Sequence, residues 1–193
     1  QGSSATQYPC IDRWGGQFSA PNNTFTVSQS TDAPVGHTHS LKFLTANAVD
    51  PSGSHYYHIG QNIEGINFAA SGWTATASGR TETPQPCTLS FWVKSSNPGK
   101  WCIALKGMND HTNSYLIVYE IQKPDTWEWK THTIYPSPEI TNWTIGSSAA
   151  MRIQFDVGTS RVSDLGTGII NRWQNHNTYT YNNQAFQATR IHG

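Results

Sequence analysis

Several aromatic residues of this sequence lie outside the alternating positions that are expected to form the core. They are Trp73, Trp143 and Trp173, with Tyr179 and Tyr181 shortly after the last. An exposed aromatic ring offers an apolar face to a sugar ring, and nearby Asn, Gln, Asp or Arg side chains pair with the sugar hydroxyls. These five residues are therefore the candidate glycan platform. The alternative for each ring is to cap the core. Trp92 and Trp127 are interpreted as structural, since they are embedded in predicted strands.

Two histidine pairs have spacings that could hold a metal ion, His37 with His39 and His55 with His58. Neither pair has a cysteine or carboxylate at a standard spacing, so we predict surface histidines and no metal site. Structural calcium occurs in similar sandwiches, but no aspartate-rich loop signals it here. No cofactor is predicted.

The carboxylates argue against catalysis. A glycosidase needs two placed carboxylates, whereas the 12 acidic residues here are scattered through turns and strand exteriors. The sequence also contains no Gly-x-Ser-x-Gly elbow, zinc-protease helix or phosphate-binding loop. We therefore expect a protein that is not an enzyme.

The charge balance bears on partners. Only 12% of the 193 residues are charged, and 12 basic residues offset 12 acidic ones when the histidines are neutral. Such a chain lacks the field that holds nucleic acid or an anionic membrane, and it lacks the repulsion that keeps proteins apart. No run approaches the ~18 apolar residues of a membrane span. We expect a homo-oligomer with no nucleic acid and no membrane insertion.

Strands are predicted where apolar and polar residues alternate. The expected strands are 25–29, 41–45, 57–63, 89–96, 101–105, 115–121, 127–134, 151–157 and 178–186. The strand 115–121 is apolar on both faces and is expected to be central. Residues 1–9 form an irregular lead-in, and 64–73 is expected to hold one helical turn.

Eight or nine strands with little helix predict an all-β fold, a jelly-roll sandwich of two antiparallel sheets in a single domain over 1–193. Its expected core contains Phe43, Ile59, Leu89, Phe91, Val93, Ile117, Ile153 and Phe155. The Asn97-Pro98-Gly99-Lys100 segment predicts a turn that joins 89–96 and 101–105 in a β-hairpin. Because the chain starts at Gln1 and stops abruptly, we expect a segment of a longer polypeptide.

The three cysteines, Cys10, Cys87 and Cys102, cannot all pair within one chain. In the predicted hairpin, Cys102 lies near Ser95 and not near Cys87. We expect buried free thiols and no disulfide framework.

Four segments together resemble a family of bacteriophage virion proteins that carry a carbohydrate-binding-module-like jelly roll. They are Ile-Asp-Arg-Trp at 11–14, Gln-Asn-Ile-Glu-Gly at 61–65, Leu-Ser-Phe-Trp-Val-Lys-Ser-Ser at 89–96 and Thr-Trp-Glu-Trp-Lys-Thr at 126–131. The resemblance spans most of 10–157, and the closing strand of the family has no match here. Members include tail-fibre, receptor-binding and head-surface proteins.

The resemblance implies a non-enzymatic protein on the virion surface. Its partners would be other virion subunits, in an assembly that is often trimeric, with contact to a host-surface glycan as a second use. Two alternatives stay open. One is a carbohydrate-binding module of a secreted hydrolase, although no Pro-, Ser- or Thr-rich linker is seen at either end. The other is a capsid cement protein, whose aromatics would point into subunit contacts and not toward solvent.

Overall fold

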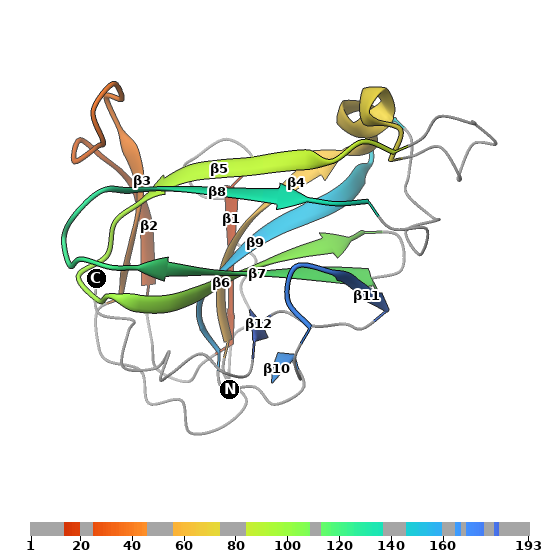
Figure 1. Cartoon of the computed structure of the whole chain (residues 1–193). Coiled ribbons are helices and arrows are strands. Elements are labelled where there is room, and N and C mark those ends of the chain that lie inside the picture. The colour runs from red at the N-terminus through yellow and green to blue at the C-terminus, as the bar shows by residue number, and fades with distance from the viewer. Residues whose placement is uncertain are drawn as a thin grey trace.

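The fold was established from a computed structural model, which describes residues 14–19, 25–45, 56–73, 84–108, 113–136, 146–159, 165–166, 169–175 and 180–181 (Figure 1). Its strands are β1 (Trp14–Ser19), β2 (Phe25–Ser30), β3 (Ser40–Thr45), β4 (Tyr56–Glu64), β5 (Cys87–Val93), β6 (Gly99–Gly107), β7 (Asn113–Ile121), β8 (Glu128–Ile134), β9 (Ala149–Thr159), β10 (Leu165–Gly166), β11 (Trp173–Asn175) and β12 (Thr180–Tyr181). The 3-10 helix η1 (Gly65–Ser71) occupies the predicted helical turn. Among the described residues, no helix has the length and hydropathy needed to cross a membrane.

The strands pair in a nested order. β6 pairs with β7, β5 with β8 and β4 with β9, all antiparallel, so the chain folds back on itself like one long hairpin. The middle pair, β5–β8, lies in a second layer, while β6 also pairs with β9 and closes the first layer. Such a rolled hairpin is a jelly roll, and the predicted all-β sandwich is confirmed.

The larger layer is a six-stranded antiparallel sheet in the order β1-β4-β9-β6-β7-β11. β5 and β8 run side by side over one face of this sheet, as Figure 1 shows. β7 is largely buried on both faces, as its apolar residues predicted, but it lies one strand from the edge of the sheet and pairs with β11 only over 113–115. The short β10–β12 pair is parallel, and β12 lies against β6 and β7.

The predicted β-hairpin of 89–105 is wrong. Within the described residues, β5 pairs only with β8 and β6 only with β7 and β9, so the two segments face each other across the core. The turn itself is real, since Gly99 has a φ of 123° that suits glycine. It forms a corner between sheets, which turn residues alone do not distinguish from a hairpin.

The core lies between β5–β8 and the six-stranded sheet. Ile103, Leu105 and Ile117 are fully buried there, and the inward side chains of β5 are half-buried against the same cluster. Phe91 meets the rings of Tyr119 and Phe155 edge to face, with centroids 5.3 and 5.2 Å away. Of the eight predicted core residues, Ile59 and Ile117 are buried, Leu89, Phe91, Val93, Ile153 and Phe155 are half-buried against the core, and Phe43 is half-buried on β3.

Other differences lie at the sheet edges. β1 was not predicted, because its Trp-Gly-Gly sequence indicates a turn, yet it pairs along its whole length with β4. Trp14 packs on Phe155 with centroids 6.0 Å apart. The described residues hold twelve strands and not eight or nine, since β1, β10 and β11 were missed. The predicted strand 178–186 is described only over β12.

Two cysteines can be placed. Cys87 and Cys102 are free thiols, half-buried and buried respectively, as predicted, although the hairpin register used to separate them is wrong. They lie in different sheets. Cys10 is outside the described residues.

The inward and outward faces of β5 give a paired stability test. Phe91→Ala removes a ring packed between two others and should lower the free energy of unfolding by about 3 kcal/mol. Trp92→Ala, one residue away on the opposite face, should cost about 1 kcal/mol or less. Urea denaturation of both variants measures this difference. A larger loss for Trp92→Ala would show that the register of β5 is reversed.

Candidate functional site

The outward side of β5–β8 carries a regular set of polar and aromatic side chains, which we call the outer face. Three cross-strand pairs form it: Thr88 with Thr133, Ser90 with Thr131, and Trp92 with Trp129. All six side chains are exposed, because successive residues of a strand point to opposite sides and the intervening residues of both strands point inward. The outer face therefore combines a ladder of hydroxyl groups with two indole rings.

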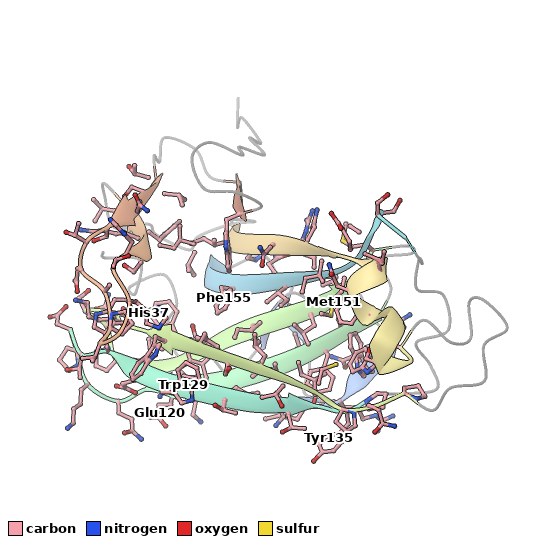
Figure 2. The ribbon with its side chains drawn as sticks, turned by 90° about the horizontal axis from the view of Figure 1, so that it is seen from above. His37, Glu120, Trp129, Tyr135, Met151 and Phe155 are labelled. Carbon is pink, nitrogen blue, oxygen red and sulfur yellow. The ribbon has the colours of Figure 1, made fainter. Side chains whose placement is uncertain are left out.

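The two tryptophans lie directly opposite each other on paired strands. Their ring centroids are 5.3 Å apart and their planes are tilted by 59°. Trp92 is 38% exposed and Trp129 is 52% exposed, so both rings keep open surface. Figure 2 shows Trp129 on this pair of strands, toward the end of the molecule where His37 lies. The rings can stack on a ligand without any movement of the core.

Just beyond the strand ends next to the tryptophan pair, Lys94, Trp127 and Asp32 form a small polar cluster. The Lys94 ammonium forms an ion pair with the Asp32 carboxylate, and the Trp127 indole N–H donates to Asp32 Oδ1 at 3.2 Å. Lys94 Nζ also lies 5.3 Å from the centroid of the Trp127 ring, a cation–π contact. The Lys94 and Trp127 hydrogen bonds lower the pKa of the Asp32 carboxyl group, which is therefore ionised at neutral pH.

Asp32 lies in the loop between β2 and β3. Hydrogen bonds of the Asp32 backbone hold this loop in place. The Asp32 N–H donates to Ser30 Oγ at 3.1 Å, and its carbonyl oxygen accepts from the Ser40 hydroxyl at 2.6 Å. At the loop tip, His37 N–H donates to Pro34 O at 3.0 Å around Gly36, whose φ is 88°. This is a turn that glycine favours, so the loop presents Asp32 to β5 and β8 in a defined position.

The predicted platform residues Trp73 and Trp173 are not exposed. They are 3% and 2% exposed, and their rings meet edge to face in the core with centroids 5.8 Å apart. Their indole N–H groups donate to the backbone carbonyls of Gln85 and Tyr135, the second at 3.0 Å. Both rings are thus core anchors that secure connecting segments, and neither offers an open face to a ligand.

The remaining predicted site residues are not tested. Trp143 and Tyr179 lie outside the described residues, and only the backbone of Tyr181 is described, in β12. His37 and His39 are exposed, as predicted, whereas His58 is buried, so the prediction of a surface histidine at that position is wrong. His55 is outside the described part of the chain. Within the described ranges, no three His, Cys, Asp or Glu side chains come together as a metal site would require.

Trp92 and Trp129 are the site residues that the sequence analysis missed. Trp92 was interpreted as structural because it is embedded in a strand. The signal was present, however, since assigning Leu89, Phe91 and Val93 to the core places Trp92 on the opposite side.

The far face of the six-stranded sheet carries a buried polar row. His58, Gln154, Asp156 and Lys106 lie on β4, β9 and β6, each at most 2% exposed. Gln154 Nε2 lies within hydrogen-bonding distance of His58 Nδ1, and Asp156 Oδ1 is 3.9 Å from His58 Nε2. Burial, helped by the positive charges of Lys106 and Arg152, lowers the pKa of His58 to about 3. His58 is therefore neutral at pH 7, and this buried row is not an accessible surface.

The buried histidine predicts a pH dependence of stability. Because His58 takes up a proton near pH 6.5 when unfolded and near pH 3 when folded, stability is full above pH 6.5 and is lost as the pH falls toward 3. The slope is about 1.4 kcal/mol per pH unit. Denaturant unfolding between pH 7 and 5 should show this loss, and His58→Gln should flatten it. An unchanged slope in His58→Gln would contradict the assignment.

Comparisons with known proteins found similarity only at the level of structure. No family model matches the chain, and no curated protein matches it. Two of the similar solved structures are of the family 11 carbohydrate-binding module of Clostridium thermocellum. One, from the cellulosomal cellulase Lic26A-Cel5E, is 14% identical with a TM-score of 0.44, over 83% of this chain and 87% of that one. The other, in complex with a β-1,3-1,4-mixed-linked tetrasaccharide, is 15% identical with a TM-score of 0.42, over 83% and 88%.

A third similar structure is the enzymatically active domain of tailspike protein 4 of bacteriophage CBA120. It is 15% identical with a TM-score of 0.44, over 77% of this chain but only 17% of that one. Since all three scores are below 0.5, we base the fold on the strand pairing of this chain and its function on its own residues.

Proposed function

We propose that this chain is a non-catalytic jelly-roll domain that binds carbohydrate through its outer face. The observation that carries the proposal is the exposed Trp92–Trp129 pair, held in cross-strand register on the outward side of β5–β8. Two neighbouring indole rings with solvent-exposed surface indicate a ligand-binding surface, because large exposed aromatic side chains in contact are characteristic of such surfaces.

The surroundings of the pair fit a sugar chain. Pyranose rings have an apolar face of C–H groups that stacks on indole, and their hydroxyl groups need hydrogen-bonding partners. The hydroxyls of Ser90, Thr131, Thr88 and Thr133 continue along the strands from the two rings. An extended glycan lying along β5 and β8 would meet rings at one end and hydroxyls along the rest. A peptide that binds as an added strand would instead form hydrogen bonds with unpaired backbone N–H and C=O groups at the edge of a sheet.

We place the domain on the surface of a phage particle, in contact with other virion subunits and, through the outer face, with host-surface glycans. The support is the sequence resemblance of the segments 11–14, 61–65, 89–96 and 126–131 to phage virion proteins. The same resemblance favours a homo-oligomer, of which a trimer is the family's common form. A carbohydrate-binding module of a secreted hydrolase would use the same face on another target, and a cement protein would bury it against a neighbouring subunit.

Single substitutions on the outer face test the proposal. The wild-type chain is first screened on a glycan array, and the affinity for the best glycan is then measured by calorimetry. Trp92→Ala and Trp129→Ala should each weaken binding at least about 30-fold, the equivalent of about 2 kcal/mol, because each removes a stacking surface.

Ile66→Ala is the control. Ile66 is 59% exposed and lies on η1, outside the β5–β8 pair, so its truncation leaves the outer face intact. This variant should bind within about twofold of wild type. Binding unaffected by either tryptophan substitution, with the fold intact by circular dichroism, would refute the proposed function.

A further inference from the structure

If the outer face binds glycans as proposed, its polar end limits which glycans it takes. We infer that Asp32 is a specificity-determining residue, which neutralises Lys94 beside the tryptophan pair and so selects uncharged glycans over those that carry carboxylates. The inference rests on the proposed function and deepens it.

The position of Lys94 is the first step. Lys94 follows Trp92 by two residues, and Trp127 precedes Trp129 by two, just beyond the ends of β5 and β8, so continued alternation would place both on the outer side. The cation–π contact shows that the Lys94 and Trp127 side chains lie together. An ammonium group next to an aromatic platform, left alone, would attract the carboxylate of a uronic or sialic acid.

The second step is that Lys94 is already paired with a carboxylate of this chain, that of Asp32. The Asp32 carboxylate pairs with Lys94 through Oδ2 and accepts from the Trp127 N–H through Oδ1. Its loop is fixed by the bonds of Ser30 and Ser40, so the carboxylate is built into the site and is not a chance contact. Asp32 remains 58% exposed in its side chain and would face an approaching ligand.

The third step concerns the charges nearby. On the inward side of β8, Lys130 and Glu128 pair with each other at 2.7 Å, so their charges cancel locally. Lys42 on β3 also acts on Asp32, and it is exposed, where salt and water screen it strongly. A sugar that carries a carboxylate would therefore meet a Lys94 ammonium group that is already paired, and the Asp32 carboxylate would repel it. A neutral sugar would find rings, hydroxyls and unused hydrogen-bonding capacity on both ions.

The test removes the charge of Asp32 while keeping its shape. Asp32→Asn retains an oxygen acceptor for the Trp127 N–H but leaves Lys94 without its counter-ion. The probes are a soluble neutral glucan and the carboxymethylated form of the same glucan, compared by affinity electrophoresis at low and high salt. Wild type should prefer the neutral form. Asp32→Asn should shift the ratio of affinities toward the carboxymethylated form by about three- to fivefold, the range of one exposed ion pair.

Three further variants make the result specific. The gain of Asp32→Asn should vanish at high salt and in the double variant with Lys94→Gln, because Lys94 is the group that is set free. Glu120→Gln removes one exposed carboxylate from β7, in the other sheet, and should leave the ratio unchanged. Lys94→Gln alone should strengthen the preference for the neutral form.

Two outcomes would overturn the inference. One is an unchanged ratio in Asp32→Asn, and the other is an equal shift in Glu120→Gln, which would indicate a general charge effect. Either result leaves the proposed function standing if Trp92→Ala and Trp129→Ala still abolish binding of the neutral glucan. Failure of the tryptophan variants, in contrast, would remove the site itself.

Discussion

Side chains of β5 alternate between the core and the outer face, and the core beneath the strand fixes which residues point inward. This is the constraint on which the rest of the structure depends. Leu89, Phe91 and Val93 must enter the core, because β5–β8 is the layer that covers the buried centre of the six-stranded sheet. Trp92 is then forced outward, since a shift of one residue would expose the whole aliphatic and aromatic set. The position of the outer face is thus a consequence of how the core is closed.

The pairing of β5 with β8 completes the outer face. Register places Trp129 opposite Trp92, so two residues 37 positions apart by number share one surface. The nested order of strands makes this register robust, because β5–β8 is held between the β6–β7 pair inside it and the β4–β9 pair outside it along the chain. The corner at Ser95, bonded to Asp125 N–H at 2.9 Å, sets where the outer face ends. There the loop from β2 supplies Asp32.

The alternation of residues was enough to predict most strands and the all-β class. It predicted that β7 is buried on both faces, and it identified Phe91 and Ile153 as residues that pack against the core. It could not distinguish a hairpin from a corner between sheets, because turn residues such as Pro98 and Gly99 suit both. It also missed β1, whose two glycines indicate a turn although pairing with β4 makes them a strand.

The candidate site was harder to predict because burial depends on tertiary packing. Trp73 and Trp173 fall in irregular sequence, which favours exposure. Although they are far apart in the sequence, their rings contact each other in the core. Trp92 falls in a strand, which was taken as a sign of burial. Strand membership, however, says only that alternate residues are buried. The outer face could have been predicted by assigning each strand an inward side first.

The most direct test of the account is an NMR titration of the indole N–H signals with a neutral oligosaccharide. The chain has eight tryptophans, so eight such signals can be assigned by substitution. The account predicts that the signals of Trp92 and Trp129 shift with a single affinity, while those of the buried Trp73 and Trp173 stay in place. Saturable binding that leaves Trp92 and Trp129 unshifted would contradict it.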